Sequence, residues 1–582
     1  MTTTDAETIS PDMPETRVSL DAFRRAAGLD GEETQLGRVF AEPPGGWSEE
    51  ADVVVVGSGA AAYAAACAAA DAGGEVIVAE KGAVYGGTSI MSGGVLHVFA
   101  NPRMRDGGVD DPREDALRYL ARCCYPSLYR SEAPRFGVGP AEFELLETYY
   151  DRGVGVLDSL REMGAVDVRA PFVGWDGTEA PDYLAHYPEN AVPRGRGLSA
   201  VKEDGTAGTG KDLVLQMKAF ADAKGARLLL RHRAVGLVMA EPGRVDGLVC
   251  RTPEGLVSLR ARSGVVFGTG GITHSAQLRT RFLRGPVAGG AGCATNTGDL
   301  IAIAEAAGAE FGLVSSGFWN QQVADFADDL APTNLNVWYV PGDGVVVVNR
   351  FGRRVVNEKA DYHNRGRAHH VWQGDEYPNQ ILFMVYDERT AERFAGAFPV
   401  PPTGTAGAHV VHGATPAELQ AGLERHLRKL GRSPALPVPD VKLDEAFAAE
   451  LEATIERFNG FARSGDDADF GRGDHPIDRW AHGPPAADND LPNATMYPLS
   501  TEGPYSAIVL VGSAFEAKAG PRINSAAQVM APSGDPIAGL YGAGNCIAGV
   551  LGESYTGGGA SLGPAVVFGF IAGRHAVEEG SR

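Results

Sequence analysis

The feature that most constrains the fold is a glycine-containing turn between two apolar segments. Four valines, Val53–Val56, predict a buried strand, and Gly57-x-Gly59-x-x-Ala62 follows at once, before an alanine-rich helix and a second strand that ends at Glu80. The first glycine permits a tight turn, the second lets the backbone approach a pyrophosphate, and the alanine lets helix pack closely on strand. The start of the helix favours an anion. The pattern therefore predicts a βαβ unit that binds a dinucleotide, with Glu80 accepting hydrogen bonds from a ribose.

A second stretch rich in small residues follows Glu80 and favours one dinucleotide over another. The sequence KGAVYGGTSIMSGGVLHV supplies backbone that can follow a pyrophosphate and a ribityl chain toward a flavin ring, which an NAD-only enzyme does not need. Two distal loops, GAGN and GGGASLG, add further backbone able to approach a long cofactor closely. The sequence therefore predicts FAD. The small residues of the second stretch are Gly86, Gly87, Thr88, Ser89, Ser92, Gly93 and Gly94.

Composition narrows the class of protein. The chain has 582 residues, so more than one domain is expected. Its net charge of -22 disfavours nucleic acid as a partner, because a phosphate backbone requires a basic face. Six scattered cysteines show no metal-ligand spacing. The polar, acidic N-terminus lacks the pattern of a signal peptide, and no apolar run of about 18 residues is present, so we expect a soluble, cytoplasmic protein with no transmembrane segment.

The order of the patterns predicts a Rossmann-like α/β fold with an insertion. Residues 1–50, rich in Pro, Gly, Thr and acidic residues, are expected to be a partly ordered N-terminal extension. An FAD-binding domain of the glutathione-reductase type is expected at 51–309 and again at 511–582. The second part returns to strand, Gly-rich loop and apolar helix. Residues 310–510, with mixed strands, helices and Pro-rich loops, are expected to form an α+β catalytic or substrate domain.

Several of these motifs resemble those of one flavoprotein group. The segments GGTSIMSGG, FGTGG at 267–271, TNTGD at 295–299 and GLYGAGN resemble the fumarate reductase/succinate dehydrogenase flavoprotein superfamily. Within it the chain is most similar to the 3-ketosteroid Δ1-dehydrogenases. The cofactor-binding residues expected from the loops and the resemblance are Gly57, Gly59, Ala60, Ala61, Glu80, Lys81, Gly87, Thr88, Ser89, Ser92, Gly93, Gly94, Val235, Thr269, Gly270, Asp299, Gly544, Asn545, Ser561 and Leu562.

Two local comparisons select the subgroup. Fumarate reductases carry an Arg proton donor four residues after the Asn-Glu of their G-x-R-F-x-N-E segment. Here GRRVVNEKADY places Tyr362 there, where the ketosteroid dehydrogenases have a catalytic Tyr. Those enzymes also carry Y-P-G-P-G-A-T-I-G-P-A, and this chain has YTGGGASLGPA from Tyr555, with Gly559 at the second glycine. The Arg residues and His-Pro-Thr segment that serve dicarboxylates have no counterpart, so a small diacid is not the expected substrate.

The resemblance implies desaturation next to a ketone. Tyr555 and the Gly559 amide would form an oxyanion hole, Tyr362 would remove the α-proton, and flavin N5 would take the β-hydrogen. Tyrosine has a pKa near ~10, so the base needs help. The family uses a further Tyr, for which Tyr183 and Tyr187 are the candidates. The expected partners are a ketone, steroid-like by the resemblance, and an external electron acceptor.

The sequence is also compatible with other functions. An ene-reductase of the same fold, a dehydrogenase of a non-steroid polycyclic ketone and a flavin-binding protein with a degenerate site are the competing hypotheses. The family's covalent members have a His where Gly87 stands, which implies non-covalent FAD. The loop prolines are replaced by Thr556 and Gly558, so a softer loop is expected. The residues His363, Arg365, Arg367, His369 and His370 could line the site, but a solvated helical face is favoured.

Overall fold

The chain divides into two compact units. The computed structural model describes residues 36–174, 176–285, 287–312, 315–327, 336–432 and 441–580. Among these, unit 1 holds 285–291 and Trp319–Ser513, and unit 2 holds 36–284, 292–318 and 514–580. The insertion predicted at 310–510 has limits close to those of the long segment of unit 1. Residues 1–35 of the predicted N-terminal extension lie outside the described residues.

Unit 2 is built on a large mixed sheet. In the described residues it has nine strands in the order β1-β8-β9-β10-β2-β3-β7, with β17 beside β10 and β16 beside β17. Strands β10, β2, β3 and β7 run parallel, whereas β8, β9 and β10 form an antiparallel meander. The strands are β1 (Arg38–Phe40), β2 (Glu49–Val56), β3 (Val76–Ala79), β7 (Arg227–Leu229), β8 (Arg233–Val238), β9 (Gly247–Thr252), β10 (Gly255–Phe267), β16 (Gln528–Met530) and β17 (Pro536–Gly542).

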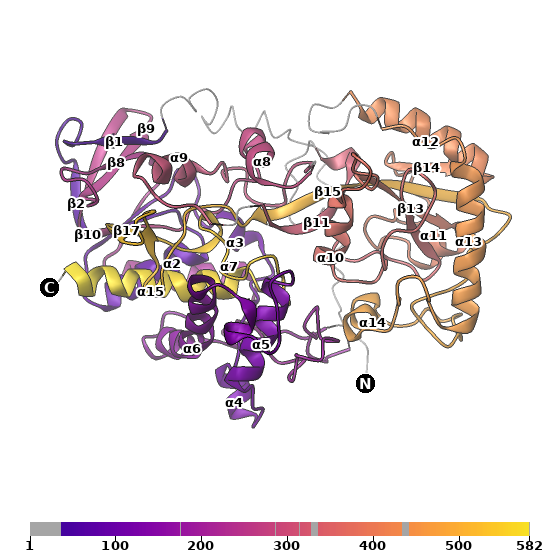
Figure 1. Ribbon diagram of the computed structural model, residues 1–582, viewed down its shortest axis with the longest axis horizontal. Helices are drawn as coiled ribbons and strands as arrows, with labels where there is room; N and C mark the ends of the chain where they lie inside the picture. Colours follow the sequence, from indigo (N-terminus) through magenta and orange to yellow (C-terminus); the bar gives the residue numbers. More distant parts are fainter. Residues whose placement is uncertain are drawn as a thin grey trace. The chain divides into compact units, whose positions relative to one another are not determined.

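Two helices pack against each other beside this sheet through small residues. The alanine-rich helix α2 (Ala60–Asp71) follows the glycine turn, and the C-terminal helix α15 (Leu562–Gly580) lies against it (Figure 1). Two glycines of α15 make the close approach possible. A Cβ on Gly569 would lie 2.3 Å from the Ala61 oxygen, and one on Gly573 would lie 2.1 Å from the Ala65 oxygen. The C-terminal segment therefore completes the dinucleotide-binding fold, although almost 500 residues separate the two helices in sequence.

A smaller layer of unit 2 carries the segment between residues 96 and 224. A three-stranded antiparallel sheet in the order β4-β6-β5 is accompanied by four helices and a 3-10 turn in the described residues. The strands are β4 (Leu96–His97), β5 (Val168–Pro171) and β6 (Gly197–Ala200). The four helices are α4 (Pro102–Asp106), α5 (Arg113–Cys124), α6 (Pro140–Glu162) and α7 (Gly210–Ala223), and the 3-10 turn is η2 (Pro134–Gly137). Outside this segment, unit 2 also has α3 (Gly87–Met91), α8 (Ala276–Phe282), α9 (Asp299–Ala306) and η6 (Gly544–Cys546).

The end of the predicted extension belongs to the main sheet instead. Strand β1 pairs in parallel with β8, and β2 begins at Glu49 rather than after residue 50. Phe40 and Trp47 pack against a small buried cluster that contains Val235. The predicted start of the FAD-binding domain at residue 51 is therefore too late, because residues 36–50 supply β1, the start of β2 and aromatic side chains that pack on the outer strands of the sheet.

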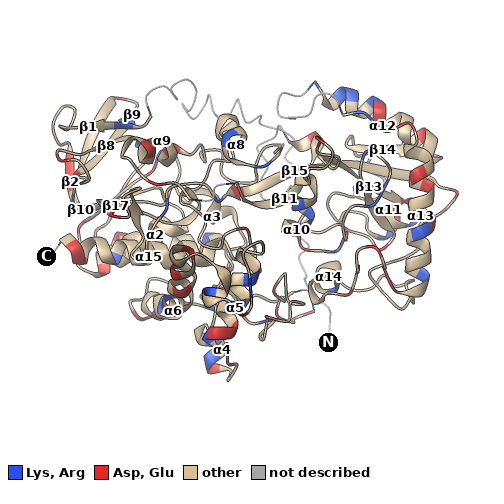
Figure 2. Cartoon of the chain, viewed as in Figure 1, with Lys and Arg blue, Asp and Glu red and all other residues tan. Residues whose placement is uncertain are grey.

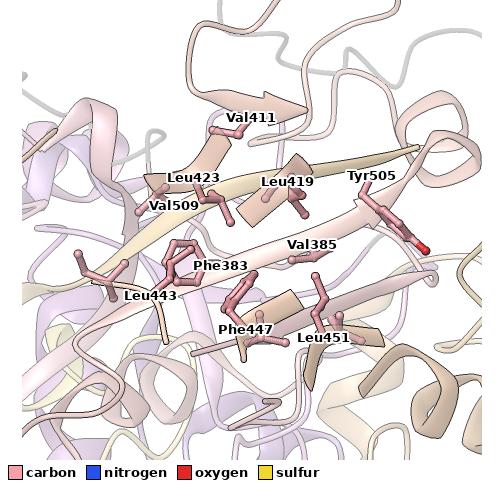
Figure 3. Packing of buried hydrophobic residues seen from close by; sticks show 14 of the residues in the cluster. Phe383, Val385, Val411, Leu419, Leu423, Leu443, Phe447, Leu451, Tyr505 and Val509 are labelled. Carbon is pink, nitrogen blue, oxygen red and sulfur yellow. The ribbon is translucent and has the colours of Figure 1, made fainter. Parts of the chain in front are cut away.

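Unit 1 is an antiparallel sheet with two long helices. In the described residues its sheet has the order β11-β15-β13-β12, with β14 paired to β15. Phe383 and Val385 of β13 pack with Leu419 and Leu423 of α12 and with Phe447 of α13 (Figure 3). The elements are β11 (Gly317–Val323), η3 (Ala324–Phe326), β12 (Val345–Val348), α10 (Tyr362–Arg367), η5 (Ala368–His370), β13 (Ile381–Asp387), α11 (Glu388–Arg393), β14 (Val410–Gly413), α12 (Pro416–Leu430), α13 (Phe447–Ser464), α14 (Pro476–His482) and β15 (Tyr505–Ala517).

Charged side chains of both signs are interspersed on the helices of each unit. Acidic and basic residues share the outer helices α12 and α13 of unit 1, and the same holds for α4 and α5 of unit 2 (Figure 2). Lysine and arginine are thus mixed with aspartate and glutamate along these four helices. Such a surface suits solubility more than binding to a polyanion.

Candidate functional site

A cleft of roughly 840 Å³ opens at the glycine turn of unit 2. Sixteen of the residues predicted to bind the cofactor line it: Gly57, Gly59, Ala60, Ala61, Glu80, Lys81, Gly87, Thr88, Ser89, Thr269, Gly270, Asp299, Gly544, Asn545, Ser561 and Leu562. They come from the β2–α2 turn, the end of β3, α3, the segment after β10, the start of α9 and both sides of the C-terminal loop. The fold therefore collects into one wall residues that span almost the whole described chain.

The two glycines of the turn have different surroundings. Gly57 has φ +99°, and a Cβ there would lie 2.5 Å from the Gly268 oxygen. Gly59 is the N-cap of α2, and the N–H of Ala60 donates to the Ser89 hydroxyl over 3.0 Å. Helix α2 starts inside the cleft, so its first N–H groups and its dipole favour an anion there. This geometry fits the pyrophosphate of a dinucleotide.

Glu80 stands at the end of β3, as expected, and is held in place by the turn. One carboxylate oxygen accepts from the Ser58 hydroxyl over 2.6 Å, and the other accepts from the Gly82 N–H over 2.7 Å. The Ser58 hydroxyl in turn accepts from the Gly86 N–H over 2.9 Å. Each carboxylate oxygen keeps a second lone pair. Glu80 can therefore still accept a hydrogen bond from a ribose hydroxyl.

Asp299, at the first residue of α9, forms a buried ion-pair cluster in the cleft wall. Its carboxylate accepts from the Lys81 ammonium over 3.1 Å and from Arg233 over 3.0 Å at both oxygens. Lys81 also donates to the Thr297 hydroxyl over 2.7 Å. Burial opposes ionisation of Asp299, but Lys81 and Arg233 outweigh it and hold its pKa well below the usual value. The cluster fixes Lys81 beside Glu80.

Four predicted cofactor residues do not line this cleft. Ser92 and Gly94 form a turn against the start of α7, where the Ser92 carbonyl accepts from the Gly210 N–H over 2.9 Å. A Cβ on Gly94 would lie 2.2 Å from the Gly210 nitrogen, so this glycine serves helix packing. Gly93 lies between them, and Val235 is buried in the cluster under β1.

The cleft also contains residues that the sequence prediction missed. They are Val56, Ser58, Ala79, His232, Ala234, Gly268, Thr295, Asn296, Ala543 and Ala565. Most are neighbours of predicted residues, and Thr295 and Asn296 lie in the TNTGD motif itself. Neighbouring residues of one motif can line the same cleft, so the TNTGD motif could have indicated Thr295 and Asn296. Ala234 lies in β8 next to the predicted Val235, and His232 lies just before that strand.

The loop with Tyr555 and Gly559 lies in an aromatic environment of unit 2. The Tyr555 ring is buried, with ring centroids 5.5 Å from Tyr183 and 5.2 Å from Phe318. Gly559 has φ +96°, and a Cβ there would lie 2.4 Å from the Val95 oxygen. Beside this loop a smaller cavity is lined by Phe318, Lys518 and Asn545, among others.

A buried charged network lies beneath this loop. A Cβ on Gly557 would lie 2.7 Å from the His97 ring, whose Nε2 lies 2.9 Å from an Asp182 oxygen. Arg196 pairs with Asp182 and makes a bidentate pair with Asp111 at 2.7 and 3.0 Å. The Tyr183 N–H donates to the Thr556 carbonyl over 2.9 Å. The expected softness of a loop without prolines is offset by these contacts.

The two candidate helper tyrosines have different surroundings. Tyr183 is buried against Tyr555, whereas Tyr187 is half-buried, with its ring 4.9 Å from His186 and 5.1 Å from the Arg122 guanidinium. The sequence treats the two alike because they share one short segment. The structure brings Tyr183 into ring contact with Tyr555 and places Arg122 over Tyr187.

In unit 1, Tyr362 is the first residue of helix α10. Asp361 caps the helix by accepting from the Asn364 N–H over 3.0 Å. The buried Tyr362 ring meets Trp338 edge to face, with centroids 4.9 Å apart. Burial raises the pKa of the Asp361 carboxyl to about 6. The cap therefore fixes the start of α10, where Tyr362 stands.

The Asn-Glu pair before Tyr362 is a structural anchor. Glu358 is fully buried and accepts from Arg354 at 2.9 and 2.8 Å, while Arg472 lies 3.3 Å from it. Burial opposes its ionisation, but Arg354 and Arg472 lower the pKa of Glu358. Asn357 donates to Asp478 over 2.8 Å. The motif thus fixes the chain just ahead of the tyrosine.

The favoured interpretation of the His/Arg cluster that follows Tyr362 is wrong. His363, Arg365 and His369 are buried rather than on a solvated face, and Arg367 alone of the five is exposed. Arg365 donates to the carbonyls of Val337 and Trp338 and to the Gln321 amide oxygen over 2.6 to 3.0 Å. The spacing of charged residues along a helix does not show whether their side chains will face solvent or bind buried backbone carbonyls.

The cleft suits FAD better than a metal or a smaller ligand. Its glycine turn, helix start and ribose acid match the three polar parts of a dinucleotide. Within the described residues no group of three His, Cys, Asp or Glu side chains is arranged for a metal ion. In the same part of the chain, no helix is both long and apolar enough to cross a membrane.

Comparison with known proteins agrees with this fold and cleft. The chain belongs to the FAD binding domain family, whose match spans residues 52–562. It is an FAD-dependent dehydrogenase of the family that holds oxosteroid and oxocyclohexanecarboxylate dehydrogenases. The predictions of FAD as cofactor, of a flavoprotein α/β fold and of a resemblance to the ketosteroid dehydrogenases are therefore confirmed.

Two relatives of this chain are named as dehydrogenases of cyclic ketones. The chain is 30% identical over 555 residues to 4-oxocyclohexanecarboxylate 2-dehydrogenase of Sinomonas cyclohexanicum, covering 86% of this chain and 88% of that protein. It is 30% identical to 3-oxosteroid 1-dehydrogenase of Mycolicibacterium smegmatis, covering 85% and 92%. The crystal structure of 3-ketosteroid delta1-dehydrogenase from Sterolibacterium denitrificans has a similar fold, with a TM-score of 0.74, 24% identity, and coverage of 91% and 100%.

Proposed function

We propose that the chain desaturates a cyclic ketone next to its carbonyl group. The observation that carries this is the buried loop in which Tyr555, between the rings of Tyr183 and Phe318, precedes Gly559 by four residues. A phenol O–H and a backbone N–H on one rigid loop are the donors that an enolate oxygen needs. The relatives named for ketone dehydrogenation support the same reaction class.

The residues would act on the substrate as follows. The Tyr555 hydroxyl and the Gly559 N–H donate to the ketone oxygen, which stabilises negative charge there and acidifies the α-C–H. Tyr362 removes the α-proton, as a tyrosinate or through a relayed phenol, and Tyr183 or Tyr187 assists it. FAD, when bound, supplies the acceptor for the β-hydrogen and its electron pair. The substrate thereby loses a proton and a hydride, and a C=C bond forms.

Three narrower points belong to this proposal. FAD binds without a covalent bond, because Gly87 stands where covalent members of the family have a histidine. The substrate is a small ketone, with 3-ketosteroids and oxocyclohexanecarboxylates as the two classes suggested by the relatives. An external acceptor removes the electrons from the reduced flavin. The cytoplasmic location stays a prediction.

The test is anaerobic mixing of the holoprotein with a ketone panel while the visible flavin absorption is followed. The panel contains a saturated 3-ketosteroid and 4-oxocyclohexanecarboxylate, and bleaching by either supports dehydrogenation. Reoxidation of the reduced flavin by an enone or by fumarate, without bleaching by any saturated ketone, would favour the ene-reductase. No response to any of these compounds would favour a degenerate flavin-binding protein.

Tyrosine variants test the roles of the residues. Tyr555→Phe and Tyr362→Phe should each slow bleaching by about 10²-fold or more, as expected for loss of an oxyanion donor or a general base. Tyr63→Phe is the matched control, since the buried Tyr63 hydroxyl has no hydrogen-bond partner among the described residues. If Tyr362→Phe reduced the flavin as fast as Tyr63→Phe, the base would be another residue.

A further inference from the structure

A buried carboxyl group lies behind the wall of the FAD cleft. Glu516, near the end of β15, is 1% exposed, and its oxygens fill space left by two glycines. A Cβ on Gly271 would lie 1.8 Å from one oxygen of Glu516, and a Cβ on Gly292 would lie 2.8 Å from the other. Any side chain at either glycine would collide with the carboxyl group. The two glycines thus make room for an acidic group that the sequence motifs did not mark.

Neutral donors surround this carboxyl group. One oxygen accepts from the Thr273 hydroxyl and from the Asn296 amide, each over 2.6 Å. The other accepts from the Ala517 N–H over 3.2 Å. A carboxylate buried among neutral donors is stabilised by hydrogen bonds but not by a counter-charge. Burial accordingly raises the pKa of Glu516 to about 7, against the lowering effect of Thr273 and Asn296.

Asn296 connects Glu516 to the cleft. Its amide nitrogen donates both to Glu516 and, over 3.0 Å, to the Thr88 hydroxyl oxygen. Thr88 also accepts from the Cys293 N–H over 2.8 Å. Both lone pairs of the Thr88 oxygen are then used, which leaves its O–H as a donor. Thr88 and Asn296 both line the cleft, so the orientation of this donor matters for whatever binds there.

The other titratable groups near Glu516 have partners elsewhere. On the segment after β10, His274 Nε2 lies 2.8 Å from the Gly292 oxygen. On the segment before α9, the Cys293 thiol lies 3.2 Å from the Thr295 hydroxyl. Lys518, just after β15, donates to the carbonyls of Gly552 and Ser554. Helix α3 contributes Thr88, which does not titrate.

We propose that Glu516 is a positioning residue for FAD: its carboxylate fixes the Asn296 amide and, through it, the Thr88 hydroxyl, so that cofactor affinity depends on whether this one group is ionised. When Glu516 gains a proton, its own O–H must donate, and the oxygen that accepts from both Thr273 and Asn296 becomes a weaker acceptor. The Asn296 amide is then no longer held toward Thr88. The inference depends on the FAD site but not on the substrate or the reaction.

Linkage sets the direction of the effect. If the ionised form of Glu516 holds the site, bound FAD must lower the pKa of Glu516, and FAD must bind more tightly above that pKa than below it. The hydrogen bond concerned involves a charged group, so the affinity should change roughly tenfold across the transition. The change should be centred close to pH 7.

The experiment is equilibrium dialysis of the full-length holoprotein, with released FAD measured by its fluorescence about one pH unit either side of 7. Wild type should release more FAD at the lower pH. Glu516→Gln mimics the protonated carboxyl group, so its affinity should match that of wild type at the lower pH and stay constant. Glu310→Gln is the matched control, because Glu310 is a partly exposed partner of Arg522 and should keep the wild-type response.

A second variant tests the connection itself. Asn296→Ala leaves Glu516 in place but removes the link to Thr88, so FAD should bind more weakly with no dependence on pH in this range. Wild-type affinity that is constant with pH, or a full pH response in Glu516→Gln or Asn296→Ala, would overturn the proposal. Tighter binding at the lower pH would also overturn it, because the carboxylate would then repel the cofactor. None of these readouts requires ketone turnover, so they stand apart from the test of the proposed reaction.

Discussion

Replacement of Gly559 by alanine tests whether the loop with Tyr555 is held rigidly. Gly559 has φ +96°, where a residue with a side chain is strained. Its new Cβ would lie 2.4 Å from the Val95 oxygen and 2.8 Å from the His97 nitrogen, which are backbone atoms that cannot rotate away. Either the loop shifts or β4 does, and both changes alter the position of the Gly559 N–H.

The cost follows from these two effects. A non-glycine residue at such a φ costs about 1–3 kcal/mol, and overpacking of a closed site costs a similar amount. The variant should therefore lose roughly 2–5 kcal/mol in free energy of unfolding or, if the loop moves instead, most of its activity on ketones. Urea unfolding followed by fluorescence and anaerobic flavin bleaching measure the two outcomes.

Gly558→Ala, at the preceding residue, is the matched control. Gly558 has no positive φ, and the nearest contact of its new Cβ is the Phe172 ring, 3.1 Å away, which can move. Its stability and bleaching rate should stay close to those of wild type. Equal behaviour of the two variants would refute the idea that this loop is held against β4, and with it the rigid placement of the Gly559 N–H.

Two further predictions concern stability. The pKa of Asp299 is lower in the folded protein than in the unfolded chain, because Asp299 pairs with Lys81 and Arg233. This pairing stabilises the fold fully above the unfolded carboxyl pKa of ~3.9, and the stabilisation is lost as the pH falls from ~3.9 through the folded pKa. Asp299→Asn should lower the free energy of unfolding by about 3–5 kcal/mol near neutral pH. In urea unfolding at the same FAD concentration, the difference in free energy between this variant and wild type should become smaller in acid. A difference that stays constant with pH would contradict the pairing. Gly155 in α6 and Gly460 in α13 have no positive φ, and a Cβ added at either position would meet no described atom within 4 Å. Alanine at either position should raise the free energy of unfolding by about 0.5–1 kcal/mol, and a loss in urea midpoint would show an unseen steric conflict.

Local patterns predicted the parts of this protein that depend on neighbouring residues. The glycine turn needs Gly57 because the backbone folds back within a few residues, and the end of β3 places Glu80 by strand length alone. These features lie in contiguous segments, so the sequence by itself determined the class of fold and the cofactor.

Only the tertiary structure decided the pairings between distant segments. The ion pair of Lys81 with Asp299 joins residues 218 apart, and the contact of Asn296 with Glu516 joins residues 220 apart. The same holds for His97 beneath the Thr556 loop and for the burial of Arg365 against backbone carbonyls. A charged or polar residue carries no local sign of its partner, because the free energy of burying it depends on groups that only folding brings together.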